Sequence, residues 1–180
     1  MQPLKFVAGA YLAFLSFAAV TGSADDLIPG FIRAEHAEVL KRWLSRNISY
    51  RIATDEDCHC DTDLVETRTR TVGAWKAKPQ YHPYYTTGDF NWDGISDFAV
   101  GVVIGKKPDT FRIAIFHGPF GPRHSSKPAF VSQPLRLGQG MDYGPPRPKP
   151  YMLLVGPFES EGALLRPTPK GYVWDEGGEE

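Results

Sequence analysis

The sequence predicts an α+β fold, with one amphipathic helix near the N-terminus packed on a mostly antiparallel β-sheet or meander. Three observations lead to this. One segment has apolar side chains at helical spacing, and many later segments are short, β-branched and aromatic, as strands are. The chain also has 18 glycines and 16 prolines, many of them between those segments. One helix with many short strands is the pattern of an α+β protein.

The helix is expected over residues 35–46, where Val39, Leu40, Trp43 and Leu44 lie among charged residues. It should end near Asn47. Short strands are then expected, in chain order, at residues 48–52, 67–75, 84–87, 98–104, 111–117, 129–137, 151–155, 162–166 and 171–174. The acidic segment 54–63 has no strand or helix assigned to it.

Some details of the sheet also follow from the sequence. Strands 98–104 and 111–117 flank a short turn and should pair as an antiparallel hairpin. Pro134 favours an edge position for strand 129–137, because proline has no N–H to donate. The segment 138–150 is rich in glycine and proline, so it is expected to be a stiff loop inside the domain. Tyr84 and Tyr85 should point to opposite faces of their strand.

Residues 88–97 read Gly-Asp-Phe-Asn-Trp-Asp-Gly-Ile-Ser-Asp and have the spacing of a loop that wraps a hard cation. Side-chain oxygens would come from Asp89, Asn91, Asp93 and Asp97, and a backbone carbonyl from Ile95. Gly94 permits the sharp turn between them. Oxygen ligands in this number favour Ca²⁺, so the sequence predicts one calcium loop between two strands.

The segment after the loop indicates the family. An EF-hand would continue into a helix and place a carboxylate at the twelfth loop position, which is Val100 here. An apolar strand follows instead, and residues 88–104 resemble a single FG-GAP or VCBS repeat, as found in small exported bacterial proteins of unknown function. The resemblance implies an exported calcium-binding structural or recognition module. Several such repeats close a β-propeller, but only one copy is found in this chain.

Trp92 stands where the repeat pattern usually has a small glycine. At a loop tip, an indole offers an apolar face with a polar edge, which suits contacts with a protein or a saccharide. Packing against the protein itself is the alternative. Trp92 is therefore the candidate ligand-binding residue.

The N-terminus has the layout of a cleaved secretory signal. Lys5 precedes an apolar run over residues 6–20, and small residues lead to a cleavage site expected after Ala24. Residues 25–180 should form a single domain, secreted or periplasmic, without membrane insertion after cleavage. Removing residues 1–24 takes away only Lys5, which leaves 19 basic and 21 acidic residues.

This nearly neutral balance, with scattered Lys and Arg, lacks the basic patch that nucleic-acid binding requires. The expected partner is an unknown cell-envelope or extracellular protein or saccharide, and the protein is expected to be a monomer. The chain has none of the common nucleophile, zinc or phosphate-binding motifs, so no catalytic residue is assigned.

Cys58 and Cys60 are the two cysteines of the chain and flank His59. They have three possible fates: a local disulfide, pairing with a second molecule, or ligation of a soft metal together with His59. The alternative function is accordingly an exported enzyme or redox-active protein that uses the segment Cys58-His59-Cys60.

Overall fold

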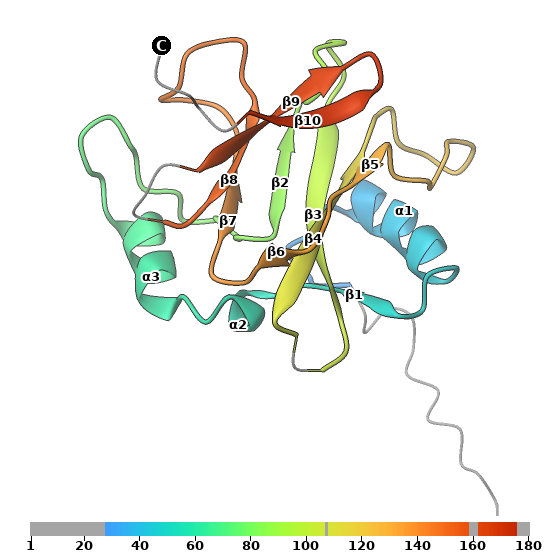
Figure 1. The fold of residues 1–180 in the computed structure, drawn as a ribbon, viewed down its shortest axis with the longest axis horizontal. Helices are drawn as coiled ribbons and strands as arrows, with labels where there is room; N and C mark the ends of the chain where they lie inside the picture. Colours follow the sequence, from blue (N-terminus) through green and yellow to red (C-terminus); the bar gives the residue numbers. More distant parts are fainter. Residues whose placement is uncertain (1–27, 107, 159–161, 176–180) are drawn as a thin grey trace, which may run out of the picture.

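A computed structural model describes residues 28–106, 108–158 and 162–175, and the signal segment expected at 1–24 lies outside them (Figure 1). Within these residues the chain forms two antiparallel sheets and few helices, as in an α+β protein. No helix in the described ranges is long and apolar enough to cross a membrane.

The first sheet is built around a long hairpin of β3 (Asp97–Ile104) and β4 (Thr110–Phe116), which confirms the predicted hairpin. On the far side of β3, β2 (Tyr85–Gly88) pairs with its first half and β1 (Tyr50–Ile52) with its second half. Beyond β4 lie β5 (Phe130–Val131) and β6 (Leu135–Arg136). These two short strands flank Pro134, inside the segment where the sequence predicts one edge strand.

The second sheet has the order β10-β9-β8-β7. Its strands are β7 (Gly140–Asp142), β8 (Leu153–Gly156), β9 (Ala163–Thr168) and β10 (Gly171–Asp175). It packs on one face of the first sheet, and its buried Met141, Leu153 and Leu165 share a core with Phe111 and Ile113 of β4. The expectation of a single sheet or meander is therefore too simple, and segment 138–150 contains a strand as well as a loop.

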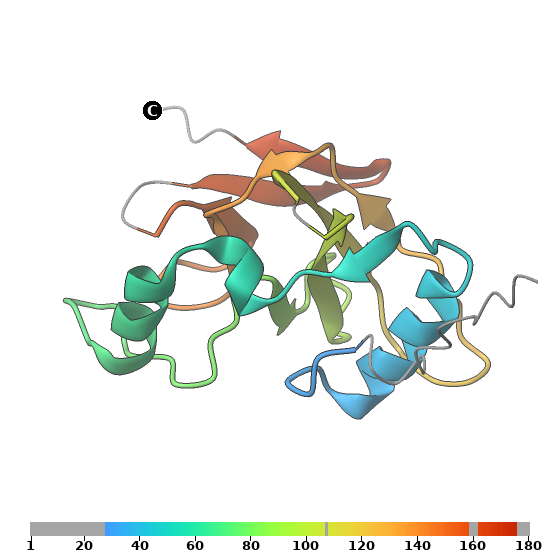
Figure 2. The same ribbon diagram turned by 90° about the horizontal axis from the view of Figure 1, so that it is seen from below.

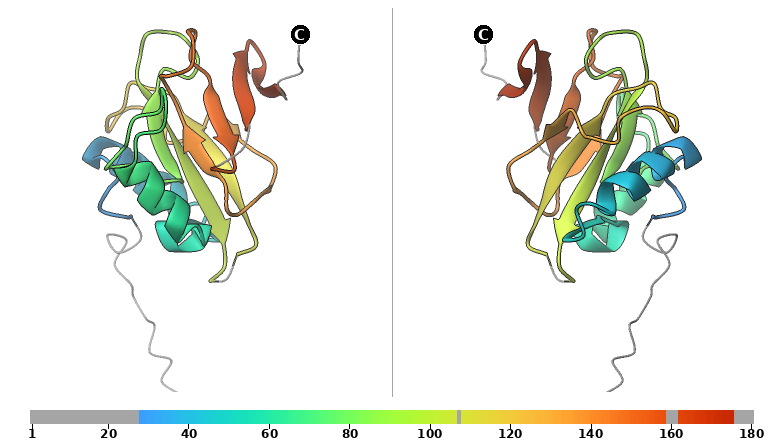
Figure 3. Two further views of the ribbon diagram at one scale, coloured as in Figure 1. Left: turned by 90° about the vertical axis from the view of Figure 1, so that its left-hand side faces the viewer. Right: turned by 90° about the vertical axis from the view of Figure 1, so that its right-hand side faces the viewer.

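The other face of the first sheet carries α1 (Ala34–Leu44), the predicted amphipathic helix. Val39, Leu40 and Trp43 of α1 pack against Phe98, Val100 and Phe116 of the sheet. The strand residues alternate between the two cores because successive side chains of a strand point to opposite faces. Figure 3 shows the resulting layers, with α1 on one side of the first sheet and the second sheet on the other.

Tyr84 and Tyr85 follow the same alternation, which confirms the prediction that they point to opposite faces. Tyr84 is buried in the core between the sheets, and Tyr85 packs against the core under α1. The side-chain hydroxyl of Tyr84 has no hydrogen-bond partner in the described residues.

Two helices occupy the segment that the sequence left unassigned. They are α2 (Asp55–Cys58) and α3 (Asp61–Thr69), and Figure 2 shows α3 at the opposite end of the molecule from α1, with α2 between them. The strand predicted at 67–75 is wrong, because α3 runs to Thr69 and a tight turn pairs Val72 with Trp75. The sequence signal for both helices is the acidic residues in their first turns, which favour helix N-termini.

Candidate functional site

The predicted calcium loop connects β2 to β3, whose ends are held together by the pairing of Gly88 with Asp97. Two loop residues have left-handed backbone, Trp92 with φ 62° and Gly94 with φ 84°. Glycine adopts this conformation freely, whereas a bulky residue does so only when its surroundings hold it there. Trp92 is therefore held in an unfavourable backbone conformation by the contacts around it.

The loop is braced by its own side chains. Asp89 accepts hydrogen bonds through Oδ1 from the Asp93 N–H, at 3.0 Å, and through Oδ2 from the Gly94 N–H, at 2.9 Å. Asp93 Oδ1 accepts the Ile95 N–H at 2.8 Å, and Asn91 donates its Nδ2 to Asp93 Oδ2 at 2.8 Å. Such bonds from Asp and Asn to nearby backbone define turns in general, with or without a metal ion.

Asp97, the ninth position of the loop, is fully buried at 0% exposure. Its Oδ2 accepts the Phe90 N–H and its Oδ1 accepts the Gly118 N–H, both at 2.9 Å. Burial raises the pKa of this carboxyl group, although the two N–H donors oppose that rise. Asp97 thus fastens the start of the loop to the residues that follow β4.

The predicted metal ligands lie in one short segment, between β2 and β3. In the described ranges, no group of three or more His, Cys, Asp or Glu side chains is placed to hold a metal ion. The oxygens of Asp89 and Asp93 accept short-range hydrogen bonds, and those of Asp97 face two backbone N–H groups. The donor types suit calcium, since each carboxylate oxygen keeps a further lone pair for an ion.

The loop also reaches the second sheet. The Trp92 indole N–H donates to the Tyr151 carbonyl at 2.9 Å, and the Tyr143 hydroxyl donates to the Asp89 carbonyl at 2.7 Å. Tyr143 and Tyr151 belong to the connection from β7 to β8. Trp92 remains 44% exposed although its N–H is used. No local sequence signal pairs these residues, because more than fifty positions separate them.

Cys58 and Cys60 form a disulfide across His59, with their Cα atoms 5.1 Å apart. Both cysteines are buried in the core between the sheets, whereas the His59 side chain is exposed. His59 has left-handed backbone, with φ 54°, which reverses the chain between α2 and α3. With both sulfurs bonded to each other, neither is a metal ligand or a free nucleophile.

Three histidines make contacts that the sequence does not reveal. His36 Nδ1 lies 2.7 Å from the Tyr85 hydroxyl, and His117 Nε2 lies 2.7 Å from the Tyr172 hydroxyl. His82 Nδ1 lies 3.0 Å from the Asp55 carboxylate, which also pairs with Arg68. Each contact joins segments far apart in the chain, as packed and structural histidines do.

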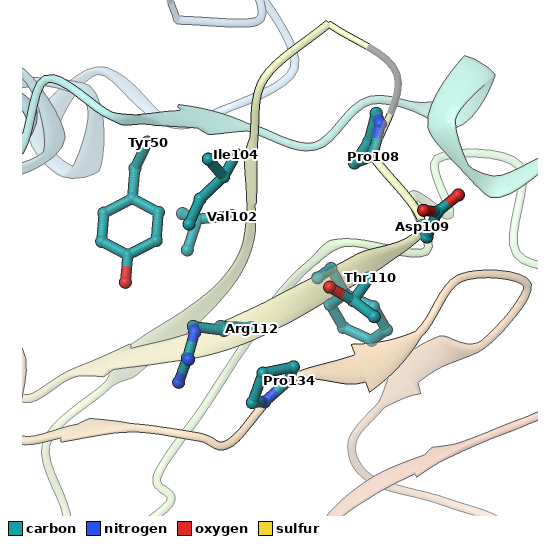
Figure 4. Close-up of a pocket in the computed structure, with 9 residues that line it drawn as sticks. Tyr50, Val102, Ile104, Pro108, Asp109, Thr110, Arg112 and Pro134 are labelled. Atoms are coloured by element: carbon teal, nitrogen blue, oxygen red, sulfur yellow. The ribbon is translucent and has the colours of Figure 1, made fainter.

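A hollow of about 110 Å³ lies at the end of β3 and β4 that is remote from the calcium loop (Figure 4). Its lining includes Tyr50, Val102, Ile104, Thr110, Arg112 and Pro134. Apolar and polar side chains therefore line this hollow together.

No family model matches this sequence, no curated protein matches it, and no solved structure matches it.

Proposed function

We propose that this protein is an exported module whose loop 89–97 binds calcium and whose role is structural or recognition rather than catalysis. The observation that carries the proposal is the side-chain oxygens of Asp89, Asn91 and Asp93, which come from one loop fixed at both ends by β2–β3 pairing. The resemblance of residues 88–104 to an FG-GAP repeat belongs to the same proposal.

Calcium binding at this loop requires specific rearrangements. Asn91 Oδ1 and Asp89 Oδ1 both accept the Asp93 N–H, at 3.2 and 3.0 Å, so these two oxygens already lie together, and a cation would replace the bond from Asn91 Nδ2 to Asp93 Oδ2. Asp89 and Asp93 can keep their backbone N–H bonds while a second lone pair of each oxygen faces the ion. Asp97 is held by two N–H donors, and its contribution is either a second lone pair or support of the loop from behind.

The expected effect of the ion is on the junction between the sheets. Three carboxylates on one loop repel one another, and a divalent cation removes that repulsion. The same loop bonds to Tyr143 and Tyr151, so an ordered loop also orders the connection between β7 and β8. Sites of extracellular type have dissociation constants of about 10⁻⁴ M, so about 1 mM calcium would add roughly 1.4 kcal/mol of stability.

Thermal melts of residues 25–180 in calcium and in chelator test the proposal. We expect a higher midpoint in calcium, and we expect Asp93→Ala to abolish the difference. Asp109→Ala is the matched control, because Asp109 is an exposed aspartate in a different turn. Equal midpoints in both buffers for the unaltered protein would show that the loop is a turn without a metal function.

The redox alternative at Cys58-His59-Cys60 has less support, because both sulfurs are buried and bonded to each other. Thiol titration of the native protein separates the two functions. A reactive thiol in the oxidised, folded protein would favour the redox role.

For the recognition role, the exposed ring face of Trp92 is the candidate contact for a cell-envelope or extracellular protein or saccharide.

A further inference from the structure

The helix α1 covers only part of its face of the first sheet. It packs over Phe98, Val100 and Phe116, toward one end of the β3–β4 hairpin. At the other end the same face presents Ile104, which is 57% exposed, and the cross-strand neighbours Thr110 and Arg136. Neighbours directly opposite in an antiparallel pair point to the same face, so this end is an uncovered patch of sheet.

Two hollows lie side by side on this patch, separated by Tyr50, which lines both. The smaller, of about 110 Å³, lies toward Arg112 and Pro134, and Figure 4 shows Val102 and Ile104 beside Tyr50 in it. The larger, of about 360 Å³, is lined by apolar residues that include Leu44 and Ile48 and by polar ones that include Lys41 and Arg51. Ile48 is 90% exposed. We call the two hollows together the Tyr50 groove.

The charges around the Tyr50 groove are mainly positive. Four cations line it, Lys41, Arg51, Lys106 and Arg112; Arg136 lies beside Thr110, and Asp109 is the acidic residue of the lining. Lys41 pairs with Glu38 and Arg51 with Asp57, whereas Lys106, Arg112 and Arg136 form no ion pair with any carboxylate in the described ranges. Arg112 donates instead to the Ser132 carbonyl, at 2.8 Å. The groove therefore combines an apolar floor with positive charge that the described carboxylates do not neutralise.

We propose that the Tyr50 groove docks an acidic, extended segment of a protein partner, with apolar side chains of that segment in the two hollows. Two hollows on either side of one aromatic ring suit side chains from alternate positions of an extended chain, which point to the same face, better than a single compact ligand. The adjacent β1 is an edge strand of the sheet, where an extended segment can lie alongside. Acidic residues of the partner would face Arg112, Arg136 and Lys106.

This inference goes beyond the calcium proposal and does not depend on it. The calcium loop ends at Asp97 and the groove includes Ile104, so they lie at opposite ends of β3. The thermal melts in calcium and in chelator do not test the groove, and a peptide-binding experiment does not test the calcium loop.

Selection of a displayed library of random twelve-residue peptides against the folded protein, residues 25–180, tests the proposal. We expect the enriched peptides to combine two or more acidic residues with apolar ones. Ile104→Asp and the pair Arg112→Gln with Arg136→Glu should each weaken binding of an enriched synthetic peptide about tenfold or more. Arg112→Gln keeps a side-chain donor for Ser132. Arg123→Glu is the matched control and should leave the affinity unchanged, because Arg123 is exposed on the loop after β4.

Other outcomes overturn the proposal. Enriched peptides that are neutral or basic, or whose binding survives Ile104→Asp, would show that the groove is not an acidic-segment site. Absence of any enriched peptide would do the same. In that case sedimentation distinguishes two other occupants of the groove. A dimer that Ile104→Asp dissociates identifies a second copy of the chain, and sedimentation with anionic vesicles identifies a lipid surface. Circular dichroism of each variant must match the parent spectrum, and a groove variant that fails this is replaced by Ile48→Asp, at an exposed position.

Discussion

His36 is enclosed by aromatic rings between α1 and the first sheet. Its ring stacks on Phe98 with centroids 4.2 Å apart and meets Phe120 edge-on at 4.7 Å. Burial, assisted by the positive charge of Arg33, lowers the pKa of His36 from its ordinary 6.5 to about 4. The sequence places a histidine on α1, but the rings around it come from β3 and the loop after β4. No helical pattern within residues 34–44 reveals them.

The His36 pKa predicts acid sensitivity. A histidine with a folded-state pKa below its unfolded value contributes stability above pH 6.5, and loses it as the pH falls through about 4. The shift corresponds to about 3 kcal/mol of unfolding free energy between pH 7 and pH 4. Urea unfolding at both pH values should show this loss for the parent protein. The double variant His36→Phe with Tyr85→Phe removes both polar partners, and the pH dependence should shrink by most of that amount. An unchanged pH dependence would refute the assignment to His36.

Gly101 lies in the middle of β3 where a side chain does not fit. A Cβ there would come within 2.8 Å of the Tyr84 Cβ, and Tyr84 is itself fully buried. We expect Gly101→Ala to lower the unfolding free energy by about 1–3 kcal/mol through overpacking. Gly30→Ala is the control, because a Cβ at Gly30 meets no atom within 4 Å. Urea midpoints of the two variants give the comparison, and equal midpoints would contradict it.

At the scale of elements, predictions from the sequence succeeded where a periodic pattern is long. The helix and the β3–β4 hairpin lie close to their expected residues, because α1 has one apolar face and β3 is buried on both. The pattern failed at α3, where Leu64 is the buried residue of nine and the alternation of Thr67 to Trp75 resembles a strand. Asp57 accepts the Thr54 N–H at 2.9 Å and caps α2. This cap is a local signal of a helix start, but the acidic residues around it obscured it.

The disulfide between α2 and α3 predicts a small effect on stability. A ring closed over so few residues restricts the unfolded chain little, so its loss should cost less than the roughly 2–4 kcal/mol typical of longer loops. Replacing Cys58 and Cys60 together by alanine, followed by urea unfolding, measures the cost. The intact protein should be a monomer two hydrogens lighter than its reduced mass. A covalent dimer or two free thiols would contradict the disulfide.

At the scale of the whole molecule, the second sheet was beyond prediction from the sequence. Three of its strands were expected and β7 was not, and which face the sheet covers depends on contacts such as the Met141 N–H to the Pro83 carbonyl, at 2.9 Å. The same holds for the candidate site. The loop spacing identifies Asp89 to Asp97, whereas its links to Tyr143 and Tyr151 arise only when the sheets pack together.

Because one core spans both sheets, they should unfold together. Met141 of β7 is fully buried in this core. Met141→Ala should therefore cost about 2–5 kcal/mol, and it should shift the near-ultraviolet and far-ultraviolet transitions equally. Two separated transitions would show instead that the second sheet unfolds on its own.

The indole of Trp92 gives the protein a built-in optical sensor. It is 44% exposed, its N–H donates to the Tyr151 carbonyl in the connection between β7 and β8, and it belongs to the chain segment where an ion is proposed. Any event that weakens the hydrogen bond to the Tyr151 carbonyl changes the solvent exposure of the indole ring. The wavelength of its emission maximum shifts with that exposure. Subtracting the spectrum of Trp92→Phe isolates this signal from the other three tryptophans of the chain. The fluorescence of Trp92 can therefore report on the loop, on its contact with the β7–β8 connection and on a bound partner, without an added label.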